Sequence, residues 1–290
     1  MKIALGTANF NNSYGILKNQ ISNYHKIKNI PKILKDNKID YLDTAFDYGD
    51  FIINKNKKIR SIKVITKIKL PTQKELVFIN NLEEIIKKKL LKLNINSFDT
   101  ILFHDINDLK SVYADRFIKK IKLLKRLNYF KKIGASIYDP KDLNIVFTKF
   151  TPDVIQLPIN IFDNRILSSP WLKKLKRKKI TIQARSVFLQ GILTSKISKL
   201  EKILKNKYFL SKVKKLDTWC KLNKISRQEA CLNFIKSINV VDILIIGINN
   251  SKQLIEILNF LKKKNNINFK DFSTNKLEII DPRKWSKIKN

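Results

Sequence analysis

Four side chains that can take part in proton transfer stand at regular places in the sequence. Asp43, Lys67 and His104 each end an apolar, β-branched run, and Tyr48 follows Asp43 by five residues. Packing does not require this set of residue types at these places. We therefore interpret the four residues as a proton-donating site.

The chemistry of the four groups is complementary. A free tyrosine has a pKa of about 10 and is a poor acid near neutrality. A lysine ammonium nearby favours the phenolate and lowers that pKa, and a buried carboxylate would keep the lysine charged. A histidine on the next strand could orient a substrate oxygen. Together they predict protonation of the oxyanion formed when a hydride reaches a carbonyl carbon, which is the chemistry of a carbonyl reductase.

Each residue taken alone also has an ordinary structural interpretation. Asp43 could be a turn or cap residue, Tyr48 a rim aromatic, and Lys67 one lysine among many. His104 is more informative, because the chain has 2 histidines and the other, His25, lies in a polar segment and is expected at the surface. The order of the four and their placement on successive strands favour the catalytic interpretation.

Apolar, β-branched runs recur along the chain and alternate with helix-length segments. The predicted strands are Lys2–Leu5, Ile39–Leu42, Ile62–Thr66, Thr100–Phe103, Lys132–Ala135, Val154–Gln156, Thr181–Ala184 and Ile243–Ile246. Helices are predicted over Leu82–Leu93 and Phe117–Leu127, and Ser226 with Glu229 forms a capping box that opens a helix through Ile235. More than one helix is expected between Gly191 and Val241.

This alternation is typical of parallel βαβ units. Eight strands favour the α/β class and a (β/α)8 TIM barrel, with an outer ring of helices, as one domain over residues 1–290. An open doubly wound sheet is the alternative, although no G-x-G-x-x-G turn follows the first strand, where Gly6 stands alone. In a barrel the carboxyl ends of the strands share one face, so the four residues would converge there.

The charge of the chain has two interpretations. Sixty Lys and Arg against 24 Asp and Glu give a net charge of +36, which would ordinarily suggest nucleic acid. The lysines are spread over the whole chain and glycine is scarce, so compositional drift is favoured over a nucleic-acid surface. Strongly salt-dependent retention of DNA or RNA would reverse that preference.

Other features of the composition indicate the compartment. No run approaches the ~20 apolar residues of a membrane span, and the N-terminus lacks the pattern of a signal peptide. Cys220 and Cys231 have no metal-ligand spacing, so no metal site is predicted. We expect a cytoplasmic protein without membrane contact.

The segment Asp43-Thr-Ala-Phe-Asp-Tyr48-Gly49 matches the motif D-T-A-x-x-Y-G, and with Lys67 and His104 it resembles the aldo-keto reductase family. The similarity extends over the chain through Gly6–Phe10 with Tyr14–Ile16, Ile133–Ser136, Asp153–Gln156, Ala184–Gly191, Ile246–Gly247 and Gln253–Glu256. The combination of Gln156–Asn160, Ala184–Gly191 and Asp281–Trp285 resembles a bacterial branch that is associated with surface-polysaccharide and sugar-modification gene clusters.

The resemblance implies a nicotinamide cofactor, NADPH with NADH as the alternative, and a small-molecule carbonyl substrate. The residues implied in cofactor binding are Ser136 and Gln156 at the carboxamide, Arg185, Ser186 and Leu189 along the ring and pyrophosphate, and Gly247, Gln253 and Glu256 at the adenosine end. Gln156 could instead be a core amide, and Gln253 and Glu256 an exposed helix face.

Several positions depart from the family pattern. Ile137 stands where many members have Asn, and Arg185 lies where an aromatic residue often stacks on the nicotinamide. Asn249 replaces an Arg that grips the 2′-phosphate, with Lys252 as a nearby substitute. The segment Asp50–Lys55 also lacks the usual continuation after the tyrosine.

We therefore predict an enzyme that reduces an aldehyde or ketone, such as a sugar-derived carbonyl, with NAD(P)H and with Tyr48 as general acid. The alternative is a non-catalytic, nicotinamide-binding regulatory protein on the same fold, since a fold does not determine a function. The oligomeric state is not predicted.

Overall fold

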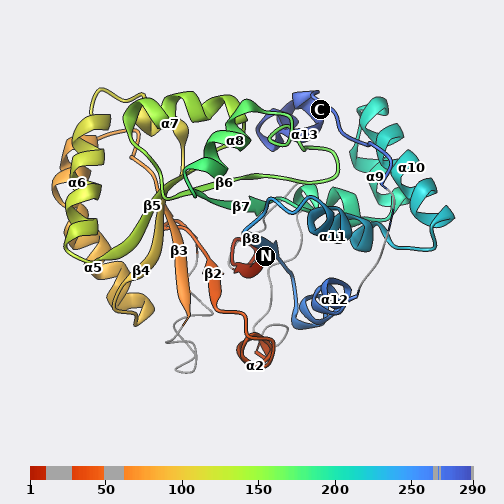
Figure 1. The fold of residues 1–290 in the computed structure, drawn as a ribbon, viewed down its shortest axis with the longest axis horizontal. Coiled ribbons are helices and arrows are strands. Elements are labelled where there is room, and N and C mark those ends of the chain that lie inside the picture. Colours follow the sequence, from red (N-terminus) through yellow and green to blue (C-terminus); the bar gives the residue numbers. More distant parts are fainter. Residues whose placement is uncertain (11–27, 49–61, 264–266, 268, 289–290) are drawn as a thin grey trace.

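The computed structural model describes residues 1–10, 28–48, 62–263, 267 and 269–288. Within them the strands are parallel and pair in chain order, and the last pairs with the first, so the sheet closes into a barrel (Figure 1). The strands are β1 (Lys2–Gly6), β2 (Tyr41–Asp43), β3 (Lys63–Ile68), β4 (Phe98–Phe103), β5 (Phe130–Ser136), β6 (Val154–Pro158), β7 (Thr181–Arg185) and β8 (Ile243–Gly247). The predicted (β/α)8 barrel is confirmed. The open doubly wound sheet is wrong, because the pairing of β1 with β8 leaves no edge strand.

All of the predicted strands are present, and the differences lie at their ends. β2 begins at Tyr41 rather than Ile39, because the Ile39 amide donates to the carbonyl oxygen of Leu34 at 2.9 Å and closes the preceding helix. Lys38 in that turn has a φ of 53°. β3 continues to Ile68, so Lys67 lies inside its strand.

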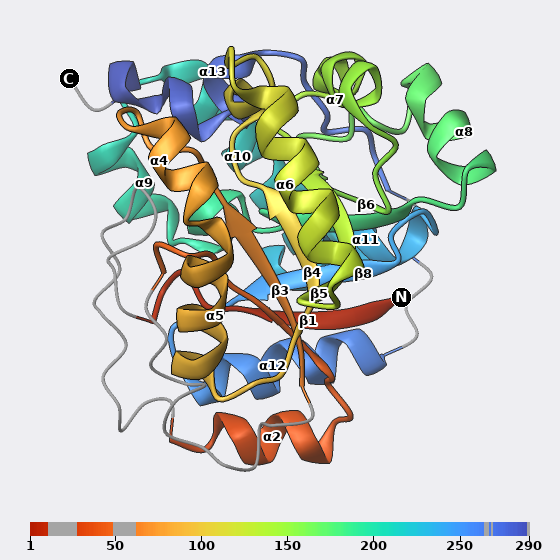
Figure 2. The same cartoon turned by 90° about the vertical axis from the view of Figure 1, so that its left-hand side faces the viewer.

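Helices surround the barrel (Figure 2). The α-helices of the described residues are α2 (Ile30–Asp36), α4 (Glu75–Asn80), α5 (Leu82–Leu93), α6 (Ala114–Arg126), α7 (Leu143–Lys149), α8 (Pro170–Arg177), α9 (Ile197–Ile203), α10 (Lys207–Leu222), α11 (Arg227–Ser237), α12 (Ser251–Lys262) and α13 (Leu277–Ile280). The 3₁₀ turns are η2 (Ile106–Leu109), η3 (Pro140–Asp142), η4 (Leu189–Thr194) and η5 (Pro282–Ile288).

The predicted helices are confirmed. α5 has the predicted bounds, and α6 covers most of Phe117–Leu127 but begins earlier. Ser226 caps α11 by accepting a hydrogen bond from the Glu229 backbone amide at 3.1 Å, which is one of the two bonds of the predicted capping box. Between β7 and β8 the chain forms η4, α9, α10 and α11.

The barrel interior changes from apolar to polar toward the carboxyl ends of its strands. A small apolar cluster contains Ala4, Tyr41, Ile65, Leu102, Val154, Ile243 and Ile245. Because side chains two residues apart in a strand point to the same face, Asp43, Lys67 and Gln156 stand one layer above Tyr41, Ile65 and Val154. All three polar side chains are buried. The fold therefore concentrates buried polar groups at one mouth of the barrel.

Three further findings concern the described residues only. None of their helices is long and apolar enough to cross a membrane. No group of His, Cys, Asp and Glu among them could hold a metal ion. Cys220 and Cys231 are buried free thiols, and burial raises the pKa of Cys220 to about 11.

Candidate active site

Asp43 and Lys67 form a buried ion pair where β2 and β3 reach the barrel mouth. Lys67 Nζ donates to Asp43 Oδ1 at 2.6 Å and to the carbonyl oxygen of Thr44 at 3.0 Å. Burial lowers the pKa of Lys67, while the charge and hydrogen bond of Asp43 oppose that shift. The carboxylate therefore supports the charged form of a lysine that its surroundings tend to neutralise.

Tyr48 lies in a tight turn that follows β2. Its amide donates to the carbonyl oxygen of Ala45 at 3.1 Å, and the Phe46 amide donates to the carbonyl oxygen of Lys67 at 3.0 Å. These bonds tie the turn to β3 and place Lys67 Nζ 5.6 Å from the centroid of the Tyr48 ring. The turn thus sets the distance between the phenol and the ammonium.

His104 directly follows β4, and its amide donates to the carbonyl oxygen of Ile68 at 2.8 Å. Its ring meets the Tyr48 ring edge-on, with centroids 6.1 Å apart and planes at 81°. Burial, and next the charge of Lys67, lower the pKa of His104 to about 4. The imidazole is therefore neutral at neutral pH and carries one N–H donor.

Gln156 holds the second oxygen of Asp43. Its Nε2 donates to Asp43 Oδ2 at 2.8 Å and to Gln183 Oε1 at 3.0 Å, and its side chain is fully buried. Each carboxylate oxygen of Asp43 thus has a donor, one from lysine and one from the amide. Gln156 Oε1 accepts no hydrogen bond from the described residues. The carboxamide contact implied for Gln156 stays a prediction.

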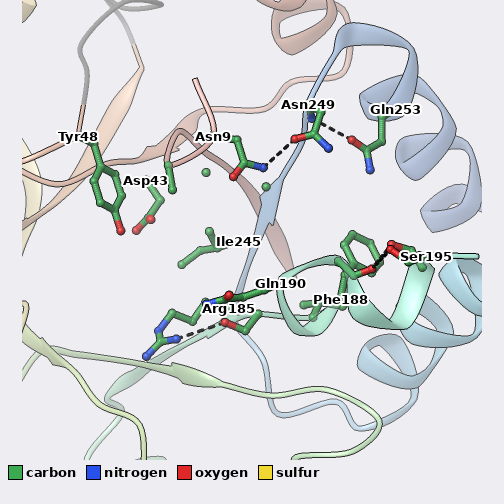
Figure 3. Close-up of a pocket in the computed structure, with 17 residues that line it drawn as sticks. Asn9, Asp43, Tyr48, Arg185, Phe188, Gln190, Ser195, Ile245, Asn249 and Gln253 are labelled. Atoms are coloured by element: carbon green, nitrogen blue, oxygen red, sulfur yellow. Dashed lines mark hydrogen bonds between the residues drawn. The ribbon is translucent and has the colours of Figure 1, made fainter. Parts of the chain in front are cut away.

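Two cavities meet at the mouth of the barrel, and Tyr48 and Arg185 line both. The first, which we call the groove, encloses about 1100 Å³ of space open to solvent. Figure 3 shows Tyr48 and Asp43 at one end of the groove, with Asn249 and Gln253 at the other. The second, which we call the side pocket, encloses about 820 Å³. Its walls are Asp47, Tyr48, Lys67, Lys69, His104, Asp105, Ile106, Ser136, Ile137, Tyr138, Arg185 and Arg283.

The far end of the groove is built by the end of β8 and the start of α12. Gln253 Oε1 accepts a hydrogen bond from the backbone N–H of Asn249 at 2.9 Å. The backbone N–H of Gln253 donates to Asn250 Oδ1 at 2.8 Å. Gly247 lines the groove, and a Cβ added there would be in ordinary van der Waals contact with Asn9 Nδ2 at 3.7 Å. Glu256 is exposed one turn further along α12 and does not line the groove.

Arg185 lies between the groove and the side pocket and lines both, and Ser186 beside it lines the groove. Arg185 ends β7, and its guanidinium donates to the carbonyl oxygen of Ile137 at 3.1 Å and to Ser186 Oγ at 3.2 Å. Leu189, which was predicted to contact the cofactor, is fully buried with a φ of 47°. Its neighbours Phe188 and Gln190 line the groove in its place.

The structure adds residues that the sequence interpretation did not single out. Asn9, just after β1, lines the groove and donates to Asn249 Oδ1 at 3.1 Å. Tyr138 and Arg283 line the side pocket. Asn9 and Arg283 both fall within motifs that carry the family resemblance, but nothing in those motifs indicates that their side chains face a cavity.

Some of the predictions fall on residues outside the described ranges. They are Gly49 of the tyrosine motif, Tyr14–Ile16, the surface position of His25 and the departure at Asp50–Lys55.

The fold and the site together define a (β/α)8 protein with a buried carboxylate–lysine pair, a tyrosine and a neutral histidine at the barrel mouth. The chain belongs to the aldo/keto reductase family, whose sequence profile matches residues 2–276. The protein is thus a nicotinamide-dependent oxidoreductase. No curated protein sequence matches the chain significantly.

Solved structures support the fold. An aldo-keto reductase of Bacillus halodurans in its holo form is similar with a TM-score of 0.72 and 17% identity, over 92% of this chain and 88% of that one. A glycerol dehydrogenase of Gluconobacter oxydans is similar with a TM-score of 0.67 and 17% identity, over 91% of this chain and 87% of that one. At this identity the likeness shows the fold alone.

The groove fits the nicotinamide cofactor of the family. It reaches from Tyr48 to Gln253 at the amino end of α12, the end of a helix that favours an anion. Gly247 lines the groove with its backbone alone, because it has no side chain. Gln156 Oε1 has no donor among the described residues, but its side chain is fully buried and lines neither cavity. Gly247 and Gln253 would hold the adenosine end, and Ser186 the middle.

Proposed function

We propose that this protein catalyses the NADPH-dependent reduction of an aldehyde or ketone, with Tyr48 as general acid. The observation that carries the proposal is the position of Tyr48. Its ring lies 5.6 Å from the buried Lys67 ammonium and edge-on to His104, at the junction of the two cavities. A carbonyl in the side pocket would therefore meet the phenol next to the groove.

The bound cofactor would supply the hydride. Tyr48 gives its phenolic proton to the oxygen that becomes the alcohol, and the Lys67 ammonium stabilises the phenolate left behind. Asp43 keeps Lys67 charged and in place. His104, neutral because of its lowered pKa, donates one hydrogen bond to the carbonyl oxygen and orients it.

Two features support the finer parts of the proposal. Lys252 is exposed in the first turn of α12, next to Gln253 of the groove, and could bind the 2′-phosphate of NADPH. The net charge of +36 attracts anionic cofactors over long range. The motif Ala184–Gly191 and the terminal Asp281–Trp285 favour a sugar-derived carbonyl, because they resemble a branch associated with sugar modification.

The test compares Tyr48→Phe with the wild type in oxidation of NADPH across a panel of simple and sugar carbonyls. We expect kcat to fall by at least about 100-fold, since general acid catalysis contributes that much or more. Cofactor binding, followed by fluorescence titration, should persist. Tyr208→Phe is the matched control, because Tyr208 is half exposed and lies outside both cavities.

Unimpaired turnover in Tyr48→Phe would remove the tyrosine from the mechanism. If the wild type binds NADPH but oxidises none across the panel, the protein is instead a nicotinamide-binding regulatory protein on this fold.

A further inference from the structure

The cations of the side pocket differ in how their charge is balanced. Three of them have a carboxylate partner: Lys67 with Asp43, Lys69 with Asp105 at 3.2 Å, and Arg283 with Asp281 at 2.7 Å. Arg185 has no carboxylate partner among the described residues; it donates to a backbone carbonyl and a hydroxyl. The remaining acid of the pocket, Asp47, has a side chain that is 70% exposed and faces His104 at 3.9 Å. Among the described residues, no carboxylate therefore balances the positive charge of Arg185 at the junction of the cavities.

The guanidinium of Arg185 is held in a defined plane. It stacks on the Tyr138 ring, with Cζ 4.2 Å from the ring centroid, and the Arg283 guanidinium lies 4.0 Å from the same centroid. An arginine has five N–H donors in a rigid fork, and the described bonds of Arg185 use two of its nitrogens. A stacked arginine with donors to spare matches the geometry of a carboxylate or phosphate.

The placement of this pair indicates which ligand it meets. Tyr138 and Arg283 line the side pocket and not the groove, whereas Arg185 lines both. Figure 3 shows the Arg185 side chain directed away from Phe188 and Gln190 and toward the side on which Tyr48 lies. The charge of Arg185 also lowers the pKa values of Lys67 and His104, so it acts within reach of the reacting groups.

We propose that Arg185 and Arg283, held on the Tyr138 ring, form a subsite for an oxyanion on the carbonyl substrate. The substrate would thus be an aldehyde or ketone that also carries a carboxylate or a phosphate. This inference rests on the proposed reductase function and narrows its substrate class.

The experiment compares pairs of substrates that differ in the acidic group. One pair is 4-oxobutanoate and butanal, which tests a carboxylate; the other is glyceraldehyde 3-phosphate and glyceraldehyde, which tests a phosphate. The quantity measured is the ratio of kcat/KM for the acidic substrate to kcat/KM for the neutral one. Any effect of a variant on cofactor binding or folding cancels in this ratio.

We expect the wild type to prefer the acidic member of at least one pair, and the pair that shows the preference identifies the oxyanion. Arg185→Gln should lower that ratio by about 10- to 100-fold, the usual range for a lost hydrogen bond to a charged group. Arg185→Lys keeps the charge without the fork and should restore part of the ratio. Lys119→Gln removes one exposed charge on α6, at a residue that lines neither cavity, and should leave the ratio unchanged.

An unchanged ratio in Arg185→Gln, or no acidic preference in the wild type, would overturn the subsite. If no carbonyl is reduced at all, the proposed function fails, and the subsite is then judged by calorimetric binding of 4-hydroxybutanoate and butan-1-ol. Acid-selective binding that Arg185→Gln abolishes would still support the subsite, and equal binding of the two would refute it.

Discussion

Replacement of Lys67 by methionine removes a buried ammonium and keeps most of the side-chain volume. In the wild type Lys67 Nζ lies 5.6 Å from the centroid of the Tyr48 ring. With the phenolate charge placed at the ring centroid, the two unit charges interact by about 3 kcal/mol at an effective dielectric constant of about 20. A loss of that size in the stabilisation of the phenolate predicts a fall in kcat of about 100-fold, since about 1.4 kcal/mol corresponds to a factor of ten.

The same replacement also affects folding. It leaves the Asp43 carboxylate buried with Gln156 as its remaining described donor, and removal of one partner of a buried ion pair costs about 3–5 kcal/mol. The matched variant Lys67→Met with Asp43→Asn carries no buried charge at this place. If both variants are folded at the assay temperature and both are slow, the loss of rate comes from the missing ammonium.

The assay is steady-state oxidation of the reduced cofactor between pH 5 and 9, with a deuterated cofactor to verify that hydride transfer limits the rate. The alkaline limb of the profile should move to higher pH, because a phenol without a neighbouring ammonium ionises less readily. A folded Lys67→Met variant with kcat within about threefold of the wild type and an unchanged profile would refute the role of the lysine.

Three further predictions concern the neighbours of this pair and the cofactor. The pKa of His104 falls from 6.5 to about 4 in the folded protein. As the pH is lowered, the unfolded chain therefore binds a proton at His104 at a higher pH than the folded protein does. The free energy of unfolding then declines between pH 6.5 and about 4. His104→Gln should remove a decline on the order of 3 kcal/mol, measured by urea unfolding at several pH values; equal pH dependence would contradict this. Gln156→Leu leaves Asp43 Oδ2 without its donor and should lower the unfolding free energy by about 1–3 kcal/mol; an unchanged thermal midpoint would show that water replaces the amide. Lys252→Glu should lower the preference for NADPH over NADH by about tenfold in KM, and an unchanged preference would place 2′-phosphate recognition elsewhere.

The strands could be predicted because each is an apolar, β-branched run, and burial inside a barrel demands such runs. Their ends were harder, because contacts outside the run decide them. Ile39 is as apolar as a strand residue, yet the left-handed turn at Lys38 brings its amide to α2 and delays β2 to Tyr41.

The convergence of Asp43, Lys67 and His104 could be predicted for a similar reason. Once a parallel barrel closes, the carboxyl ends of its strands must share a face, so position in the strand order is enough. Side chains in the connecting turns follow no such rule. Leu189, at positive φ, turns into the core while Phe188 and Gln190 beside it face the groove.

The sequence alone does not show which of the many positively charged residues has a functional role. With 60 lysines and arginines, composition cannot separate a functional cation from the general excess, and Arg185 was predicted from resemblance as a cofactor contact. Arg185 is distinguished by a comparison with its neighbours. Lys67 and Arg283 each have a buried carboxylate partner, and Arg185 has none among the described residues. A stacked guanidinium beside the reacting groups, with donors to spare and no carboxylate partner among the described residues, matches an anionic group on a ligand. The proposed oxyanion subsite therefore rests on the contacts of one cation with residues distant in the sequence, which composition does not reveal.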